Sequence, residues 1–516
     1  MKNQGIAISL LLLILLSSCS TTNDHLKLER FDVEFKPRNI VFILSDDHRY
    51  DFMGFTGKVP WLKTPHMDNL AKSGRYFPNA FVTTSLCSPS RASILTGLYS
   101  HSHEIVDNQA PMPEGLTFFP QYLQAAGYQT SFFGKWHMGD MGDNPQPGFD
   151  HWVSFKGQGT YYNCNLNING KQHKYSDSVY MSELLTEHAV DWLKNRDTKK
   201  PFFLYLSHKA VHAEFKPAKQ HKDIYKNEKL VLPQSFEMTK NETLEKDGKS
   251  YADNNYHNPD YNYGEGRIPD WVKEQRFSWH GVDYPYHGKQ KFKDFFIKYC
   301  ETIKGVDESI GTIMAQLERE DLLESTMVIY MGDNGFSFGE HGLIDKRHFY
   351  EESVKVPFIL HCPDLVEGGT NINNMVQNID VAPTILEAAG LKAPEHFHGK
   401  SIMPLLKGGE VEWRDKIFYE YYWEYDFPMT PTVHGVRTDR YKYIRYHGVW
   451  DSNEFYDLKN DPEEQNNLIA SPEHQEIIKE LVHELYTWLE STDGMQIPLK
   501  RTIKHRWGDY RNMNIY

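Results

Sequence analysis

The chain has 516 residues, too many for one ordinary hydrophobic core, and its 40% hydrophobic and 24% charged content is typical of a folded globular protein. Its 70 acidic side chains outweigh 56 basic ones, for a formal net charge of −14. This disfavours a general nucleic-acid-binding protein, because such proteins need a basic surface. Five cysteines are too few for a disulfide scaffold.

The N-terminus has the pattern of an export signal. Residues 6–16 form an almost unbroken apolar run of 11 residues, which is too short to span a membrane but suits a signal peptide. Leu16-Ser17-Ser18-Cys19 resembles a bacterial lipobox, in which Cys19 would be lipidated; the alternative is an ordinary signal with an incidental cysteine. We expect a lipoprotein signal peptide at residues 1–18, a tether at 19–37, and an exported protein held to the bacterial outer membrane through a lipid anchor only, facing the periplasm or the cell surface.

Four short apolar segments, each followed directly by polar residues, predict buried strands. They are residues 39–44, 130–133, 201–206 and 326–331. Helical patterns occur at residues 65–73, 182–195 and 292–317. This alternation predicts an α/β fold with a large mixed, mostly parallel sheet covered by helices. The polar residues would then meet at the carboxyl edge of the sheet, where ligands bind.

The sequence pattern changes after about residue 408. Strand-like segments at 417–425 and 433–446 precede an amphipathic helix at 475–490. We therefore expect an α/β catalytic domain at residues 38–408 and a smaller C-terminal α+β subdomain at 409–516. Residues 213–290 have weak periodicity and many Asn, Asp, Gly and Tyr residues, which predicts an insertion that forms part of a substrate cleft.

The most informative motif is Cys87-Ser88-Pro89-Ser90-Arg91, followed by Leu95-Thr96-Gly97. It resembles the signature of type I, formylglycine-dependent sulfatases of the alkaline phosphatase superfamily. The resemblance implies that a formylglycine-generating maturation enzyme oxidises Cys87 and that the hydrated aldehyde attacks sulfur and then expels sulfate. Arg91 would hold the second oxygen of the diol. A helix beginning near Ser88 would direct the positive end of its dipole at the sulfate.

The same resemblance assigns roles to the polar residues after the predicted strands. Oxygen-rich ligands suit a hard cation, and one Ca²⁺ per subunit would be bound by Asp46, Asp47, Cys87, Asp333 and Asn334. The catalytic residues would be Cys87, Arg91, His137 and His212, with Lys135 and Lys346 binding sulfate. The neighbouring His208 makes the assignment of His212 less secure. After Cys19 and Cys87, three cysteines remain, at positions 164, 300 and 362, and we expect no dependence on disulfides.

The sugar would be recognised outside the sulfate site. One candidate is the aromatic segment 251–287, and the other is the pair His434 and Arg437 in the subdomain. Aromatic faces stack on sugar rings, and arginine binds anionic groups with two parallel hydrogen bonds.

The resemblance covers about residues 38–468 and implies a carbohydrate sulfatase that degrades sulfated polysaccharides. Ulvan, glycosaminoglycans and mucin all stay open as sources of the sulfated oligo- or polysaccharide substrate. Residues 207–212 are similar to bacterial N-acetylglucosamine-6-sulfatases. The alternatives are a phosphoesterase or phosphonate hydrolase of the same superfamily, or a non-catalytic glycan-binding lipoprotein. A single metal and two sulfate-facing lysines favour the sulfatase, and no nucleic-acid partner is expected.

Overall fold

The computed structural model describes residues 26–31, 37–139, 142–236, 245–246, 249–250, 269–275, 281–282, 292–408, 411–425, 427–448 and 453–498. The predicted signal peptide, Cys19 and most of the aromatic segment 251–287 lie outside these residues. Within the described ranges, no helix has both the length and the apolar character needed to cross a membrane.

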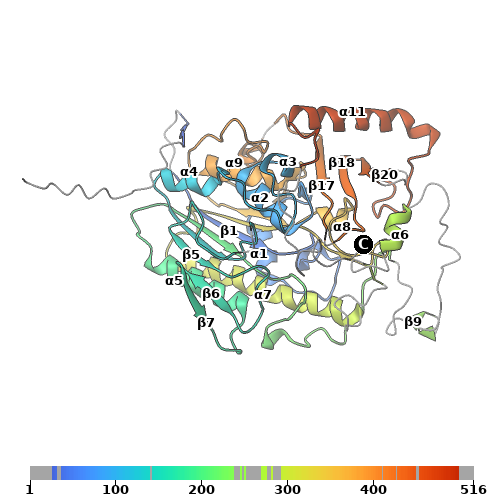
Figure 1. Cartoon of the computed structure of the whole chain (residues 1–516). Coiled ribbons are helices and arrows are strands. Elements are labelled where there is room, and N and C mark those ends of the chain that lie inside the picture. Colours follow the sequence, from blue (N-terminus) through green and yellow to red (C-terminus); the bar gives the residue numbers. More distant parts are fainter. Residues whose placement is uncertain are drawn as a thin grey trace, which may run out of the picture.

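A ten-stranded sheet forms the centre of the larger part of the molecule (Figure 1). Its strands, in spatial order, are β15 (Thr370–Asn371), β2 (Arg75–Tyr76), β14 (Phe358–His361), β11 (Thr326–Gly332), β1 (Asn39–Ser45), β8 (Phe202–Ser207), β4 (Gln129–Gly134), β5 (His151–Ser154), β6 (Asn165–Ile168) and β7 (Lys171–Lys174). The run from β11 to β5 is parallel, whereas β14, β6 and β7 pair antiparallel with their neighbours. The predicted mixed, mostly parallel sheet is confirmed.

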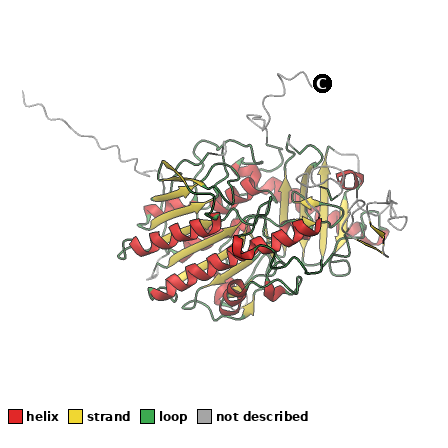
Figure 2. Ribbon diagram, turned by 90° about the horizontal axis from the view of Figure 1, so that it is seen from below, coloured by secondary structure: helices red, strands yellow, loops and turns green. Residues whose placement is uncertain are grey.

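Helices cover both faces of this sheet. The helices that precede the C-terminal sheet in the chain are α1 (Pro65–Ser73), α2 (Cys87–Thr96), α3 (Ser100–His103), α4 (Phe119–Ala125), α5 (Met181–Asn195), α6 (Asp270–Gln275), α7 (Phe292–Arg319), α8 (Glu351–Val354), α9 (Val381–Ala388) and α10 (Met403–Lys407), with 3-10 turns at Gly54–Thr56, Lys219–His221 and Asn378–Asp380. Of these, α6 lies beside the C-terminal strands (Figure 1). Figure 1 shows α5 and α7 on one side of the sheet and α2, α4 and α9 on the other. Seen from below, α5 and α7 run side by side (Figure 2). The three predicted helices agree with α1, α5 and α7 to within two residues.

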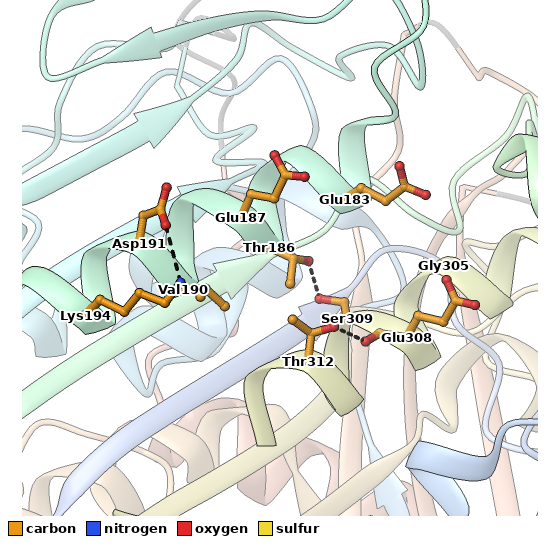
Figure 3. Close-up of a pocket in the computed structure, with 10 residues that line it drawn as sticks. All are labelled: Glu183, Thr186, Glu187, Val190, Asp191, Lys194, Gly305, Glu308, Ser309 and Thr312. Atoms are coloured by element: carbon orange, nitrogen blue, oxygen red, sulfur yellow. Dashed lines mark hydrogen bonds and ion pairs between the residues drawn. The ribbon is translucent and has the colours of Figure 1, made fainter. Parts of the chain in front are cut away.

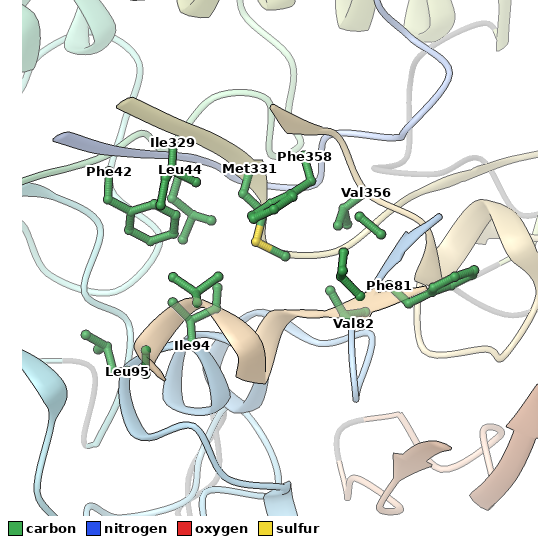
Figure 4. Close-up of a cluster of buried hydrophobic side chains, with 14 of the residues drawn as sticks. Phe42, Leu44, Phe81, Val82, Ile94, Leu95, Ile329, Met331, Val356 and Phe358 are labelled. Atoms are coloured by element: carbon green, nitrogen blue, oxygen red, sulfur yellow. The ribbon is translucent and has the colours of Figure 1, made fainter. Parts of the chain in front are cut away.

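The unbroken apolar sequence of β1 follows from this two-sided covering. Successive strand residues point to opposite faces, so Phe42 and Leu44 enter one core while Val41 and Ile43 enter the other. In Figure 4, Phe42 and Leu44 face Ile94 of α2. Both faces of the strand are therefore dry, and its polar groups can appear only after its end.

The C-terminal subdomain is built on an antiparallel sheet. Its strands are β17 (Lys416–Tyr421), β18 (Thr432–Thr438), β19 (Tyr441–His447) and β20 (Glu454–Asp457), followed by the 3-10 turn Pro472–His474 and by α11 (Gln475–Ser491). Phe418 stacks on Trp488 of α11 at 4.8 Å between ring centroids. The segment predicted as strand-like at 433–446 is a hairpin of two strands, and the predicted strand at 417–425 ends at Tyr421. Short strand pairs elsewhere are β3 (Ala80–Phe81) with β16 (Val376–Gln377), β12 (Ser337–Phe338) with β13 (Ile344–Asp345), and β9 (Glu245–Lys246) with β10 (Lys249–Ser250).

Candidate active site

Polar side chains from four neighbouring strands meet at the carboxyl edge of the large sheet. The order β11-β1-β8-β4 is parallel throughout, so the residues that follow these strands lie at one edge. They are Asp333 and Asn334 after β11, Asp46 and Asp47 after β1, His208, Lys209 and His212 after β8, and Lys135 and His137 after β4.

Cys87 is the first residue of α2, and its side chain is fully buried. Its Sγ lies 3.5 Å from Asp46 Oδ1, 3.9 Å from Asp47 Oδ1 and 3.2 Å from Lys346 Nζ. Burial raises the pKa of the thiol, although nearby Lys135 and Lys346 oppose this. The Sγ atom marks where the oxygens of a modified residue 87 would lie, with the positive end of the helix beside them.

Each of the three site carboxylates has its own cation. Asp46 pairs with Lys135 Nζ, Asp47 with Lys346 Nζ, and Asp333 Oδ2 with Arg91 Nε at 2.9 Å. All six side chains are buried. Burial alone would favour a neutral Asp46, but Lys135 and the other nearby cations hold the pKa of that carboxyl well below its ordinary value.

Arg91 also ties two strand ends together. Its Nη1 donates to Lys135 O at 2.7 Å and to Ser207 Oγ at 2.6 Å. Ser207 Oγ in turn donates to the same carbonyl at 2.8 Å. Sequence reasoning missed Ser207, whose only signal is its place as the last residue of the β8 run.

Two buried oxygen atoms of the predicted metal ligands have no hydrogen-bond partner among the described residues. They are Asp47 Oδ2 and Asn334 Oδ1. The potential ligand atoms of Asp46, Asp47 and Cys87 lie within 4.8 Å of one another. Burial and the neighbouring Asp46 raise the pKa of Asp333 to about 7, although Arg91 opposes this. This oxygen-rich set fits a hard divalent cation.

The backbone at the site is shaped for these contacts. Asp47 adopts a left-handed conformation with φ of 57°, and its N–H donates to Asp333 Oδ1 at 2.9 Å. Gly134 ends β4, and a Cβ there would overlap the Ser207 carbonyl oxygen. Gly335 follows Asn334, and a Cβ there would overlap the Glu352 carbonyl oxygen. The two glycines therefore allow the close approach of the segments that carry Lys135 and Asn334.

Three histidines lie near the strand ends, and their contacts separate them. His212 Nε2 lies 3.8 Å from Asp47 Oδ2. His208 is instead turned toward α7, where its Nε2 hydrogen-bonds Ser309 Oγ at 3.0 Å, so the geometry places His212 in the cluster. His137 is fully buried, and neither of its ring nitrogens has a hydrogen-bond partner in the described part of the chain. Burial and Lys135 lower the pKa of His137 and of His212 well below the ordinary value.

His434 and Arg437 lie in β18 and have packing contacts of their own. Arg437 Nε and Nη2 donate to the carboxylate of Glu351 at 3.0 and 3.1 Å, and its guanidinium lies 4.6 Å from the centroid of the Phe81 ring. His434 Nδ1 lies 2.9 Å from His447 Nε2. The structure does not join these two residues to the strand-end cluster by any of these contacts, and their predicted contact with sugar stays a prediction.

A groove between α5 and α7 is a separate feature (Figure 3). Its lining residues are Glu183, Thr186, Glu187, Val190, Asp191, Lys194, Gly305, Glu308, Ser309 and Thr312. Thr186 and Ser309 share a 2.6 Å hydrogen bond. The groove belongs to the helices that cover the sheet, and no predicted site residue lines it.

Comparison with known proteins identifies the family of the chain. A family model described as Sulfatase matches residues 38–391, and a model described as N-sulphoglucosamine sulphohydrolase, C-terminal, matches residues 339–491. An N-acetylglucosamine-6-O-sulfatase of Bacteroides thetaiotaomicron is 32% identical over 489 residues, which cover 87% of this chain and 86% of that protein. An N-acetylglucosamine-6-sulfatase of Capra hircus is 30% identical over 406 residues, or 74% of this chain and 66% of that protein.

A solved structure shows the same fold. It is the structure of BT4656 in complex with its substrate D-glucosamine-2-N,6-O-disulfate, and it is 29% identical to this chain. The match covers 90% of this chain and 100% of that one, with a TM-score of 0.78. The likeness of fold therefore extends over nearly the whole chain.

Proposed function

The chain belongs to the sulfatase family, has the fold of the alkaline phosphatase superfamily and is a sulfuric ester hydrolase of carbohydrates. From that premise we propose that it removes the 6-O-sulfate of glucosamine or N-acetylglucosamine residues, with formylglycine made from Cys87 as nucleophile and one bound Ca²⁺. The observation that carries the proposal is the position of Cys87 Sγ beside the ammonium of Lys346 and the carboxylates of Asp46 and Asp47.

The cations around residue 87 suit a sulfate ester. Lys135 and Lys346 supply two ammonium groups for its non-bridging oxygens, and Arg91 holds the surrounding backbone and carboxylate in place. As a hydrated formylglycine, residue 87 would supply one oxygen to attack sulfur and a second to expel sulfate. Burial keeps His137 and His212 neutral, so each imidazole can accept a proton from a hydroxyl group.

The metal would be held by Asp46, Asp47, Asp333 and Asn334, together with an oxygen of residue 87 once it is formylglycine. Its charge would balance the crowded carboxylates and the substrate sulfate, and it would polarise oxygen atoms bound to it. Asp47 Oδ2 and Asn334 Oδ1, the two buried oxygens without a hydrogen-bond partner among the described residues, support this assignment. The all-oxygen side-chain set supports calcium over a softer transition metal.

The sugar has an aromatic surface available next to the segment that carries Lys346. Arg347 follows Lys346 and donates from Nε to Glu424 at 2.7 Å. Trp423 and Tyr425, on either side of Glu424, are each 38% exposed. Exposed aromatic faces stack on sugar rings, so this surface supports a carbohydrate substrate.

The relatives named above act on 6-sulfated glucosamine, and this supports the choice of position. The test is release of the inorganic anion, measured by ion chromatography. Sulfate is measured from N-acetylglucosamine 6-sulfate, its 3-sulfate isomer and galactose 6-sulfate, and phosphate from N-acetylglucosamine 6-phosphate. We expect turnover of the first substrate to exceed the others by at least an order of magnitude. Faster hydrolysis of the phosphate ester would favour a phosphoesterase, and equal turnover of the sulfate isomers would refute the position specificity.

We also propose that the protein is exported and anchored through a lipid on Cys19. The lipobox-like sequence at residues 16–19 supports this. Cys19→Ala should release the protein from membranes and leave its specific activity unchanged. Continued membrane retention of this variant would point to another anchor.

A further inference from the structure

Lys209 is a buried cation that the proposed reaction does not use. It follows β8, its side chain is 5% exposed, and its Nζ lies 4.7 Å from the centroid of the Tyr161 ring. The carboxylates of Asp46 and Asp47 act on it electrostatically, as does Lys135, which together with burial lowers the pKa of Lys209 to about 8. Lys209 therefore lies beside the strand-end cluster rather than at the surface.

The charges of the cluster leave Lys209 without a carboxylate. The three carboxylates already pair with Lys135, Lys346 and Arg91. Within the described ranges, no carboxylate lies at ion-pair distance from Lys209 Nζ and no acceptor hydrogen-bonds it. A largely buried ammonium without a carboxylate partner is costly, and an anionic group of a ligand would offset this cost.

Lys209 is joined to His212 by two connections. His212 N donates to Lys209 O at 3.0 Å. Tyr161, whose ring lies against the ammonium, donates its hydroxyl to His212 O at 2.7 Å. The three residues therefore form one connected group beside the cluster. The charges of Lys135, Lys346 and Lys209 all act on His212.

We infer that Lys209 is a further substrate-contacting residue, whose ammonium pairs with an anionic oxygen of the sulfated substrate. This inference rests on the proposed sulfatase function. The oxygen has two sources: a non-bridging oxygen of the sulfate, or the bridging sugar oxygen, which takes the electron pair as the S–O bond breaks. The ring of Tyr161 alone is weak compensation for a buried ammonium, which is why a substrate oxygen is the stronger assignment.

The test compares Lys209→Met with the wild-type protein on two substrates. Methionine keeps an unbranched side chain against Tyr161 and removes the charge. The substrates are N-acetylglucosamine 6-sulfate, whose alcohol is a poor leaving group, and 4-nitrophenyl sulfate, whose phenolate leaves easily. Because a charge-assisted contact is lost, we expect kcat/KM for the sugar sulfate to fall by roughly tenfold or more, with an unchanged melting temperature and partial recovery in Lys209→Arg.

The two sources give different outcomes, and both support the inference. An equal loss on the two substrates assigns Lys209 to a non-bridging sulfate oxygen, whereas a loss mainly on the sugar sulfate assigns it to the bridging oxygen. Wild-type kcat/KM on both substrates would overturn the inference. So would a fall in melting temperature with activity losses that Lys209→Arg does not recover.

Lys355→Met is a matched control. Lys355 is another largely buried lysine against aromatic rings, with Nζ 4.7 Å from the Tyr50 centroid, but it has a carboxylate partner in Glu351 at 3.7 Å. Its loss should lower stability without changing the ratio of activities on the two substrates. If the wild-type protein released sulfate from neither substrate, the proposed function itself would fail, and this result is distinct from a failure of the Lys209 inference.

Discussion

Two dense groups of charged side chains are buried in this molecule, and they differ in how their cations are paired. In the strand-end cluster, Lys209 has no carboxylate at ion-pair distance among the described residues. Asp47 and Asn334 of the same cluster each keep an oxygen without a hydrogen-bond partner among the described residues. At the junction between α8 and the C-terminal sheet, Lys442 Nζ is fully occupied, with Phe349 O and Glu351 Oε1 at 2.8 Å and Glu464 Oε1 at 2.7 Å. The junction cation is therefore paired with carboxylates, whereas the strand-end cluster contains a cation that is not.

The difference indicates two roles. At the junction, Arg437 and Lys442 pair with Glu351, and Lys442 also pairs with Glu464. Glu352 Oε2 has no hydrogen-bond partner among the described residues, and Glu464 Oε1 has none besides this ion pair, but the paired cations stabilise the fold and hold the subdomain against the segment that follows Lys346. The strand-end cluster keeps unmet capacity, which a ligand can fill. Changes in the cluster should act mainly on turnover, and changes at the junction should act mainly on stability.

Replacing the proposed nucleophile should give the largest effect. Cys87→Ala should lower sulfate release by roughly a thousandfold or more, because no other side chain can supply the attacking oxygen, and it should leave the melting temperature nearly unchanged. Turnover and thermal unfolding measure the two results. Cys164→Ala, a change of another buried cysteine, should keep wild-type activity. Near wild-type turnover of Cys87→Ala would defeat the mechanism.

Removal of the metal should lower both the turnover and the thermal stability of the protein. Chelation should suppress turnover and also lower the melting temperature, because crowded carboxylates repel once the cation is gone. Calcium at about a hundred times its dissociation constant should restore about 2.7 kcal/mol of stability. Asn334→Ala should weaken this calcium-dependent shift in melting temperature. A protein indifferent to exhaustive chelation would rule out the metal assignment.

Breaking an ion pair at the junction should lower stability more than turnover. Arg437→Ala leaves Glu351 with an incomplete set of buried partners and should destabilise the fold by about 3–5 kcal/mol. Below the melting temperature, its residual activity losses on N-acetylglucosamine 6-sulfate and on 4-nitrophenyl sulfate should be equal. Denaturant unfolding and the two assays check this. A stable variant impaired only on the sugar would instead assign Arg437 to sugar recognition, as the sequence predicts.

A smaller effect should appear in the pH dependence of a buried pair that joins α3 to β17. His101 Nδ1 lies 2.7 Å from Glu420 Oε2. His101, against the effect of burial, lowers the pKa of Glu420 to about 2, and Glu420 raises the pKa of His101 despite burial. The stability from Glu420 is lost as pH falls from about 4.5 through about 2, and that from His101 is lost as pH rises above about 6.5.

The pair should therefore contribute most between pH 4.5 and 6.5. The measurement is the melting temperature of the wild-type protein and of Glu420→Gln across pH, and the gap between them should be widest in this window. A gap that does not vary with pH would contradict the ion pair.

The strand ends and the proposed nucleophile could be identified from the sequence because their signals are local. A strand covered on both faces must be apolar throughout, so the first polar residues after β1 and after β11 mark where each strand ends. The motif at residues 87–91 is contiguous in the sequence. The partners of these residues were not accessible. Arg437 finds Glu351 across 86 positions, and only the turn of the chain after β8 decides between His208 and His212. Lys209 had no signal at all, because its lack of a carboxylate emerges only when the other pairs are known.

The central claim is that the strand-end cluster is built around a formylglycine at position 87, and the mass of one peptide tests it most directly. Trypsin cleaves after Arg75 and Arg91, which releases residues 76–91 with Cys87 as their only cysteine. In protein produced with a formylglycine-generating enzyme, we predict a peptide of the lower mass expected for the aldehyde, with sulfate release rising in proportion to the converted fraction. Full sulfatase activity from a protein whose peptide carries only unmodified cysteine would contradict the account.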